Sequence, residues 1–328
     1  MIFLKKPLII LTGPTAVGKT KLSISLAQAV NGAIISADSM QVYRHMDIGS
    51  AKIRPEEMCG VPHYLIDVLD PSEEFHVVKF VELAHEAMEK IYAAGQIPIV
   101  TGGTGFYIQA LLKEVDFTES HGELPIRKQL EEKAATEEGA AELYRELSEV
   151  DSASAETIHP NNVKRVIRAL EYYHETGQKI SEHNEEQKQK ESPYCSAYFV
   201  LNDERSILYD RIDRRVDQMI CDGLVDEVFH LKEMGYTRDL VSMQGLGYKE
   251  LFPYLAGECT LEEAVYIIKR DTRHFAKRQL TWFRREKDVI WLNKPDFDYD
   301  EEKILSYMLD RWNEIVSADA KEEGEQSC

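Results

Sequence analysis

Four residues near the N-terminus carry the strongest chemical signal in the chain. Gly13, Gly18, Lys19 and Thr20 have the P-loop spacing G-x-x-x-x-G-K-[ST]. Such glycines let backbone N–H groups turn inward around an oxyanion, and the helix that follows directs its positive end at the same point. The lysine adds a mobile charge, and the threonine offers a hydroxyl to Mg²⁺. The motif predicts a magnesium-dependent phosphate or diphosphate site made by Gly13, Pro14, Thr15, Ala16, Val17, Gly18, Lys19 and Thr20.

The residues on either side of this motif support that interpretation. Residues 8–11 form a continuous apolar run, which is typical of a strand buried on both faces. Leu22, Ile24, Leu26 and Ala27 supply the apolar face of a helix. A glycine-containing turn without a ligand is the structural alternative. The motif does not say which molecule carries the phosphates.

Two further strands are expected to end beside the P-loop. Residues 33–37 read as a strand that delivers Asp38, and residues 97–101 read as a strand that runs into a glycine-rich turn at 102–105. In open parallel sheets the ligand lies outside the carboxyl ends of the strands, so Asp38 is predicted to face the same crevice as Lys19. The alternatives are a solvent-exposed acid at Asp38 and a glycine turn that serves only close packing.

The order of elements predicts an α/β fold. Further strands are expected at 63–68, 198–201 and 289–292, with amphipathic helices between them. From residue 116 onward this alternation gives way to long polar helical patterns. We therefore expect a P-loop NTPase-like parallel sheet flanked by helices, formed by residues 1–115 and 196–316, with a helical insertion domain at 116–195. The acidic tail at 317–328 lacks apolar residues and is expected to be disordered.

Composition limits the possible partners and location. The net charge is −19, yet residues 264–287 hold eight basic and two acidic residues, so an acidic average conceals one basic segment. No run is long enough to span a membrane and no secretory signal is present, which predicts a cytoplasmic protein. The five cysteines are scattered and contain no C-x-x-C pair. They are expected to be reduced thiols, neither a disulfide framework nor a zinc site.

Five segments together resemble the bacterial tRNA dimethylallyltransferases. They occur in family order over nearly the whole chain up to about residue 315, and they read GPTAVGKT, ISADSMQVYRHMDIGSAK, PIVTGGTGFY, IHPNNVKRVIRALE and AKRQLTWFR. The resemblance implies transfer of the dimethylallyl group of dimethylallyl diphosphate to N6 of adenosine 37 beside the tRNA anticodon, with release of pyrophosphate. The eukaryotic relatives carry an added zinc finger, for which this chain has no cysteine pair.

The chemistry of that reaction can be assigned to particular residues. An adenine amine is a poor nucleophile, and a carboxylate that accepts its proton assists attack; Asp38 matches the family residue. The departing diphosphate needs P-loop amides, Lys19, Mg²⁺ near Thr20 and an arginine. By resemblance the arginine is Arg211, with Arg214 and Arg215 as rivals. A surface ion pair with Asp210 or Asp213 is the alternative role of Arg211.

The resemblance also implies contacts with the tRNA anticodon stem-loop. Cations and an aromatic ring in residues 277–284 suit backbone phosphates and one stacked base, although core packing is an equal alternative for Trp282. The partners expected are tRNA and dimethylallyl diphosphate, with no membrane, and the chain is expected to be a monomer. The predicted tRNA contacts are Asp38, Ser39, Met40, Gln41, Gly103, Thr104, Arg127, Lys164, Arg165, Gln244, Gly247, Tyr248, Lys277, Arg278, Gln279, Trp282 and Arg284.

Other functions are compatible with parts of the pattern. A small-molecule P-loop kinase also places an acid after its second strand, but it leaves the insertion and the basic segment unexplained. An adenylate isopentenyltransferase shares the donor site and differs in the acceptor, so the helical insertion separates the two. A tRNA-binding protein without catalysis has no need of Lys19 and Asp38 together.

Overall fold

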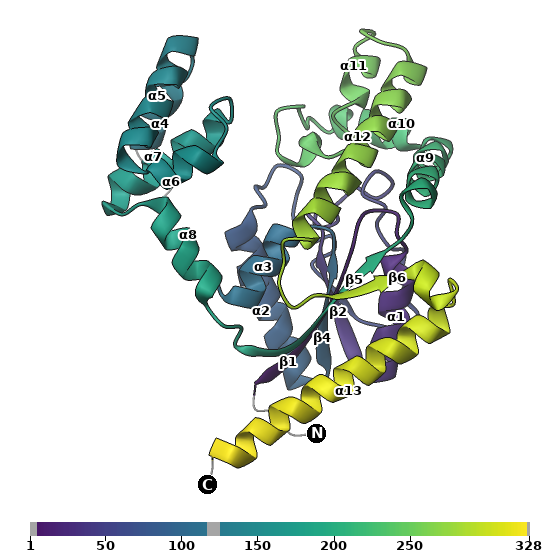
Figure 1. The fold of residues 1–328 in the computed structure, drawn as a ribbon. Helices are drawn as coiled ribbons and strands as arrows, with labels where there is room; N and C mark the ends of the chain where they lie inside the picture. Colours follow the sequence, from purple (N-terminus) through teal and green to yellow (C-terminus); the bar gives the residue numbers. More distant parts are fainter. Residues whose placement is uncertain (1–4, 117–124, 327–328) are drawn as a thin grey trace. The chain divides into compact units, whose positions relative to one another are not determined.

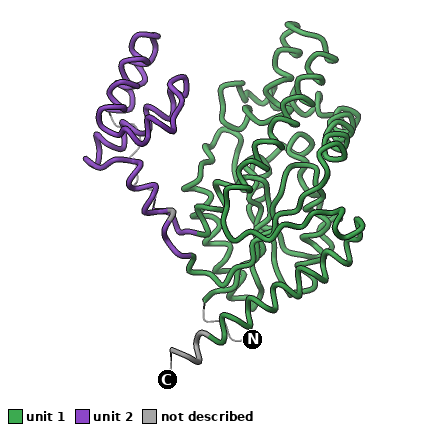
Figure 2. Tube along the Cα trace, viewed as in Figure 1, with its two compact units in different colours: residues 1–112, 192–328 green, residues 113–191 purple. Residues whose placement is uncertain are grey.

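The structure, a computed structural model, describes residues 5–116 and 125–326. The chain divides into two compact units (Figure 2). Unit 1 contains Met1–Leu112 and Ser192–Cys328, and unit 2 contains Lys113–Glu191. Each unit is described by itself below.

Unit 1 is built on a sheet of six parallel strands in the order β3-β2-β4-β1-β5-β6 (Figure 1). The P-loop strand β1 is central, between β4 and β5. Helices connect and flank the strands, which confirms the predicted α/β class with a P-loop-type parallel sheet. The strands are β1 (Lys6–Thr12), β2 (Gly32–Ala37), β3 (His63–Tyr64), β4 (Ile97–Gly102), β5 (Tyr194–Asn202) and β6 (Ile290–Asn293).

Two of the predicted strand boundaries are wrong. The strand expected at 63–68 stops after Tyr64, because Leu65 and Asp67 have left-handed backbone angles, φ 63 and 56, that leave the extended region. At the other end of the sheet, β5 begins at Tyr194 and not at residue 198. Tyr194 and Cys195 pair with the start of β1, so the sheet takes residues that were assigned to the insertion.

Alternate residues of β1 point into two different hydrophobic cores. Leu8 and Ile10 pack on the face covered by α2 (Val77–Ala93) and α3 (Gly105–Lys113). Ile9 and Leu11 pack on the opposite face, against α1 (Lys19–Val30) and α13 (Glu301–Gln326). All four side chains are at most 1% exposed. This double burial explains why the strand reads as an unbroken apolar run.

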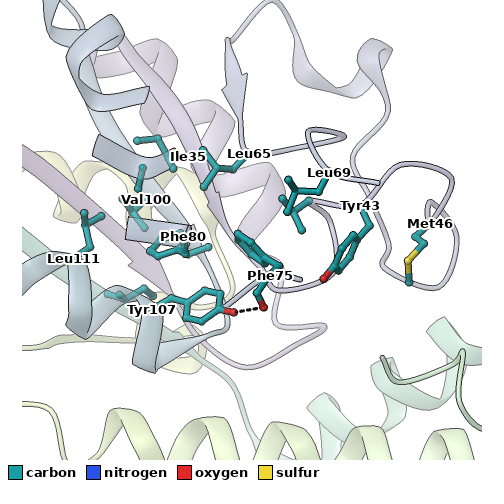
Figure 3. Packing of buried hydrophobic residues seen from close by; sticks show 14 of the residues in the cluster. Ile35, Tyr43, Met46, Leu65, Leu69, Phe75, Phe80, Val100, Tyr107 and Leu111 are labelled. Atoms are coloured by element: carbon teal, nitrogen blue, oxygen red, sulfur yellow. Dashed lines mark hydrogen bonds between the residues drawn. The ribbon is translucent and has the colours of Figure 1, made fainter. Parts of the chain in front are cut away.

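An aromatic cluster fixes the loop that follows β2 (Figure 3). The ring of Phe75 makes edge contacts with Tyr43 and Tyr107, with centroids 6.4 and 5.5 Å apart. Phe80 stacks on Tyr107 at 4.8 Å, and the Tyr107 hydroxyl donates a hydrogen bond to the Phe75 carbonyl. Tyr43 lies only five positions after Asp38 and is fully buried. The cluster therefore anchors the segment that carries Asp38.

The second half of unit 1 is helical up to the last strand. A capping box at Thr260 and Glu263 begins the longest of these helices, α12. The helices are α9 (Arg205–Cys221), α10 (Leu224–Glu233), α11 (Leu251–Leu255) and α12 (Leu261–Phe283), and the short 3-10 turns of unit 1 are η1 (Pro55–Met58), η2 (Ser242–Gln244) and η3 (Lys294–Phe297).

The C-terminal segment is helical, which corrects the prediction that residues 317–328 are disordered. Helix α13 continues to Gln326, and residues 327–328 lie outside the described part of the chain. Trp312 and Val316 are buried in the second core, and the Asp319 carboxylate accepts a hydrogen bond from the Lys5 backbone N–H. The residues beyond them are mostly Ala, Glu and Lys, which extend a helix that packing has already nucleated.

Unit 2 is all helical within the described residues. Leu143, Leu147 and Leu170 are fully buried at its centre. The side chains of Thr136 and Asp151 cap two of its helices by accepting backbone N–H bonds. Its helices are α4 (Pro125–Lys133), α5 (Glu137–Val150), α6 (Ser152–Thr157), α7 (Val163–Thr176) and α8 (Ile180–Gln189).

Two observations bear on membrane and redox chemistry. Among the described residues, no helix is both long and apolar enough to cross a membrane. Cys59, Cys195, Cys221 and Cys259 are free thiols, and Cys328 lies outside the described residues.

Candidate active site

A cavity of about 710 Å³ opens at the carboxyl edge of the sheet in unit 1. The loops after β1, β2 and β4 line one side, and α9, α12 and the loop around η2 line the other. The predicted site residues that line it are Thr15, Ala16, Gly18, Lys19, Thr20, Asp38, Ser39, Met40, Gln41, Gly103, Thr104, Arg211, Gln244, Gly247, Arg278 and Gln279.

The P-loop forms its cradle because two glycines adopt angles closed to other residues. Gly13 and Gly18 have φ 144 and 101. A Cβ on Gly13 would lie 2.2 Å from the Leu201 carbonyl oxygen, so only glycine allows β5 to approach this closely. Gly13, Pro14 and Val17 are buried behind the cavity, and Val17 packs in the core under α1.

The Lys19 ammonium makes no ion pair with a carboxylate in the part of the chain that the structure describes. It donates hydrogen bonds to the carbonyls of Gly13 and Pro14, at 2.9 and 2.8 Å. Burial and the neighbouring Arg215 guanidinium lower the pKa of Lys19 to about 7, although Asp38 acts in the opposite direction. Two cations and one carboxylate thus face each other at the P-loop, an excess of positive charge suited to an anion.

The three rival arginines of α9 occupy different positions. Arg214 is 79% exposed, pairs with Asp210 and does not line the cavity. Arg211 lines the cavity, but its guanidinium donates to the Asp203 carboxylate at 2.6 Å. It pairs with neither of the two partners considered in the sequence analysis, Asp210 and Asp213. Arg215 also lines it, and no ion pair to its guanidinium occurs within the described ranges. Arg215 is therefore the cation of α9 with free donors for a ligand.

Asp38 is held in a fixed position at the end of β2. One oxygen, Oδ1, accepts hydrogen bonds from the backbone N–H groups of Met40 and Gln41, at 2.8 and 3.4 Å. No hydrogen bond to its other oxygen, Oδ2, is found among residues 5–116 and 125–326. The carboxylate is thus oriented through one oxygen and retains acceptor capacity in the cavity.

Gln279 joins α12 to two of the loops. Its Oε1 accepts from the Thr15 N–H, and its Nε2 donates to the Gly103 carbonyl, both at 2.9 Å. A Cβ on Gly103 would lie 2.1 Å from that Nε2, so the glycine is required for this contact. Gln279 is only 6% exposed. Its role in this structure is to fix the P-loop relative to the glycine turn, and a tRNA contact by Gln279 stays a prediction.

Two aromatic residues of the predicted tRNA surface pack inside unit 1. Tyr248 is fully buried and donates its hydroxyl to Glu227, so its side chain offers no exposed surface to tRNA; this corrects our expectation. Trp282 packs edge-on against Phe106 and touches Gly105, where an added Cβ would lie 2.2 Å from the indole ring. That position corresponds to the packing alternative for Trp282.

Glu227 is a supporting residue that the sequence did not reveal. Its carboxylate accepts from the backbone N–H groups of Asp47, Ile48 and Gly49, at 2.9, 2.7 and 3.1 Å, and from Tyr248 at 2.7 Å. It thereby ties the 47–51 loop to the loop after η2, and both loops line the cavity. No local sequence signal distinguishes this glutamate from the other acidic residues of a surface helix.

The basic helix α12 is partly neutralised by α9. Lys269 pairs with Asp217 and Arg273 with Asp213. Towards the C-terminal end, Lys277, Arg278 and Arg284 have no ion pair among the described residues, and Arg278 lines the cavity over the ring of Phe275. The unpaired cations that suit phosphates are thus at the cavity end of the helix.

The remaining predicted tRNA contacts belong to unit 2. Arg127 pairs with Glu131 and with the buried Glu171. Lys164 and Arg165 are exposed at the start of α7, and no ion pair to either is found in the described part of unit 2. Their role towards tRNA stays a prediction.

The donor set of the cavity fits magnesium. Within the described residues, no three His, Cys, Asp or Glu side chains gather as a metal site. Thr20, which is exposed, lines the cavity and offers a hydroxyl oxygen. Mg²⁺ typically binds through one or two protein oxygens together with substrate phosphates and water, so Thr20 can serve as its protein ligand.

Family models and sequence relatives agree on the family that this chain resembles. The IPP transferase family matches residues 41–286, and the isopentenyl transferase family matches residues 6–74. A tRNA dimethylallyltransferase of Lachnoclostridium phytofermentans is 66% identical over 304 residues, covering 93% of this chain and 96% of that protein. One from Acetivibrio thermocellus is 50% identical over 92% of this chain and 96% of its own length.

Solved structures give the same result. The full-length tRNA isopentenylpyrophosphate transferase of Bacillus halodurans has a TM-score of 0.72 and 44% identity, covering 96% of this chain and all of that one. A eukaryotic dimethylallyltransferase acting on tRNA has a TM-score of 0.76 and 35% identity, covering 88% of this chain and 74% of that one. This chain is an enzyme that belongs to the tRNA dimethylallyltransferase family.

Proposed function

We propose that this enzyme transfers the dimethylallyl group of dimethylallyl diphosphate to N6 of adenosine 37 in tRNA and releases pyrophosphate. The observation that carries the proposal is one cavity lined by the P-loop, by Asp38 and by the glycine turn after β4. A phosphate cradle and an oriented carboxylate in the same cavity suit a reaction that has a diphosphate leaving group and an amine nucleophile.

The P-loop side holds the leaving group. As the bond from the allylic carbon to the diphosphate oxygen breaks, its electron pair stays on the diphosphate, and negative charge grows there. We assign three donors to that charge: Arg215, the amides at the start of α1, and Lys19, whose ammonium donates to the Gly13 and Pro14 carbonyls in the free enzyme. Bound Mg²⁺, held by Thr20, would supply further neutralisation of the diphosphate.

The Asp38 side receives the nucleophile. The N6 lone pair forms the new bond to the allylic carbon, and the amine must lose a proton as it does so. Asp38 Oδ1 already accepts backbone N–H bonds, and Oδ2 retains its lone pairs for that proton. Moving the adenine out of the base stack into the cavity costs little free energy in a loop, because a loop base has no base pair to break.

The lining also distinguishes a prenyl donor from ATP. Val216 and Met219 of α9 and Ile268 of α12 line the cavity as an apolar wall. Such a wall suits a five-carbon tail with no polar atoms. We assign the tail to this wall, on the path from the P-loop toward Asp38.

The tRNA side is assigned to the cationic end of α12, together with Lys164 and Arg165 of unit 2. We propose that the enzyme acts as a monomer. We place it in the cytoplasm, where unmodified tRNA is present.

Acceptor identity is tested with radiolabelled dimethylallyl diphosphate and three acceptors. Unmodified tRNA with adenosine at position 37 should become labelled, and nuclease digestion followed by mass spectrometry should find the added group on N6. The same tRNA with guanosine at position 37, and AMP, should remain unlabelled. Labelled AMP would show that the acceptor is a free nucleotide and would contradict the proposal.

Asp38→Asn should lower turnover by roughly 10² to 10⁴, the usual contribution of a positioned general base. Asparagine keeps a side-chain oxygen for the Met40 N–H, so the loop should retain its shape and tRNA affinity should change little. Asp298→Asn, an exposed acid that does not line the cavity and pairs with the exposed Lys303, is the matched control and should be near wild type. Affinity for tRNA that falls in parallel with turnover would assign Asp38 to recognition instead.

Diphosphate binding should be coupled to protonation of Lys19. Its pKa of about 7 in the free enzyme means that Lys19 is mostly neutral at pH 8, and a bound anion must raise that pKa. Pyrophosphate should therefore bind with uptake of close to one proton at pH 8 and almost none at pH 6, and affinity should fall as pH rises above 7. Calorimetry in buffers of different ionisation enthalpy measures this uptake.

Lys19→Arg is the control for protons taken up by pyrophosphate itself, because guanidinium does not titrate in this range. The wild type should take up more protons than this variant at pH 8. Equal uptake in the two proteins would mean that Lys19 is not the titrating group.

A further inference from the structure

Lys294 is a lysine at the P-loop that no motif includes. It is the first residue of η3, directly after β6 ends, and therefore stands at the carboxyl edge of the sheet where ligands bind. The residue is only 8% exposed. Its Nζ lies 3.1 Å from the position that a Cβ on Gly18 would occupy. The ammonium is thus packed against the last turn of the P-loop.

The neighbouring cations have partners, and Lys294 has none. Arg211 pairs with Asp203 at 2.6 Å, and Lys21 pairs with Glu301 at 2.7 Å. Over residues 5–116 and 125–326, no hydrogen bond or ion pair to the Lys294 ammonium is found. The Lys294 side chain is mostly buried while its ammonium still reaches solvent, so its hydrogen-bond donors are open to a ligand.

The electrostatic surroundings act on the charge of Lys294. Lys294 lies beside the N-terminal end of α1, where the helix dipole is positive. Burial and the nearby Arg211 lower the pKa of Lys294, while Asp203 and Glu301 offset this only in part. Burial, the Arg211 guanidinium and the helix dipole thus disfavour an ammonium at this position in the free enzyme. A bound anion at the P-loop would offset them.

Lys294 and Arg215 approach the P-loop in different surroundings. Arg215 interacts with Lys19 and Asp38, inside the cavity. Lys294 interacts with Arg211, Asp203, Glu301 and Lys21, next to Gly18. The two cations therefore occupy different positions at the P-loop.

We propose that Lys294 is a further ligand of the donor's diphosphate, contacting its phosphate oxygens beside Gly18. The inference rests on the proposed function, in which Gly13–Thr20 holds that diphosphate. Lys294 stays protonated throughout and donates hydrogen bonds, while the electron pair of the broken carbon–oxygen bond remains on the diphosphate. It adds donor affinity and stabilises the leaving group together with Lys19.

The test compares Lys294→Met with the wild type in calorimetric titration with pyrophosphate and Mg²⁺. A lost charge-assisted hydrogen bond should weaken pyrophosphate binding about 10- to 100-fold. The melting temperature of the free variant should be close to that of the wild type, because the Lys294 ammonium donates to no other described residue. The affinity for tRNA should be unchanged.

Lys303→Met is the matched control, because Lys303 is an exposed lysine of α13 whose partner Asp298 is itself exposed. It should bind pyrophosphate like the wild type. Lys294→Gln, which keeps a donor but no charge, is a second variant should the methionine fail to fold, and it should also bind pyrophosphate more weakly than the wild type.

Lys19→Ala separates the two proposals. Weakened pyrophosphate binding in Lys19→Ala with unchanged binding in the Lys294 variants would overturn the role of Lys294 alone. Unchanged binding in both would show that the P-loop does not hold the diphosphate, and the proposed function would fail with it. An equal loss in Lys303→Met would reduce the effect to general surface charge and would also overturn the inference.

Discussion

The structure depends on an unbalanced set of charges at the carboxyl edge of its sheet. Among the described residues, Lys19 donates only to backbone carbonyls, Arg215 faces it, and the Asp38 carboxylate offsets both. The fall in the pKa of Lys19 to about 7 is the electrostatic consequence. Folding tolerates this cost because the sheet is buried on both faces, and binding of an anion recovers it.

The surrounding elements hold these charges in register. Parallel pairing of β1 with β4, and of β4 with β2, brings three loops to one edge. Gln279 then fixes the P-loop to the glycine turn from above, and Glu227 fixes the 47–51 loop to the loop after η2. The aromatic cluster around Phe75 anchors the segment after Asp38 (Figure 3). The site is thus preorganised by hydrogen bonds from side chains of α10 and α12.

Sequence reasoning succeeded where the signal is local. The P-loop can be predicted from its own glycines together with the strand before it and the helix after it. The fold class follows from the alternation of such strand–helix units along the chain. It failed at Leu65 and Asp67, whose left-handed backbone conformation is not marked by a glycine. It also failed in the tail, where the packing of Trp312 nucleates a helix that the lack of apolar residues did not predict. Arg215, Glu227 and Lys294 could not be ranked from the sequence. Their importance comes from what lies opposite them, and only the tertiary fold determines that.

The central claim is that the P-loop of this enzyme holds a diphosphate leaving group and not a nucleoside triphosphate. The most direct measurement is the phosphate product formed from dimethylallyl diphosphate and unmodified tRNA, in buffer with Mg²⁺ and without ATP. The account predicts one pyrophosphate per modified adenosine and no orthophosphate. It also predicts that added pyrophosphate competes with the donor, whereas a non-hydrolysable ATP analogue does not. An obligatory requirement for ATP, or release of orthophosphate, would contradict it.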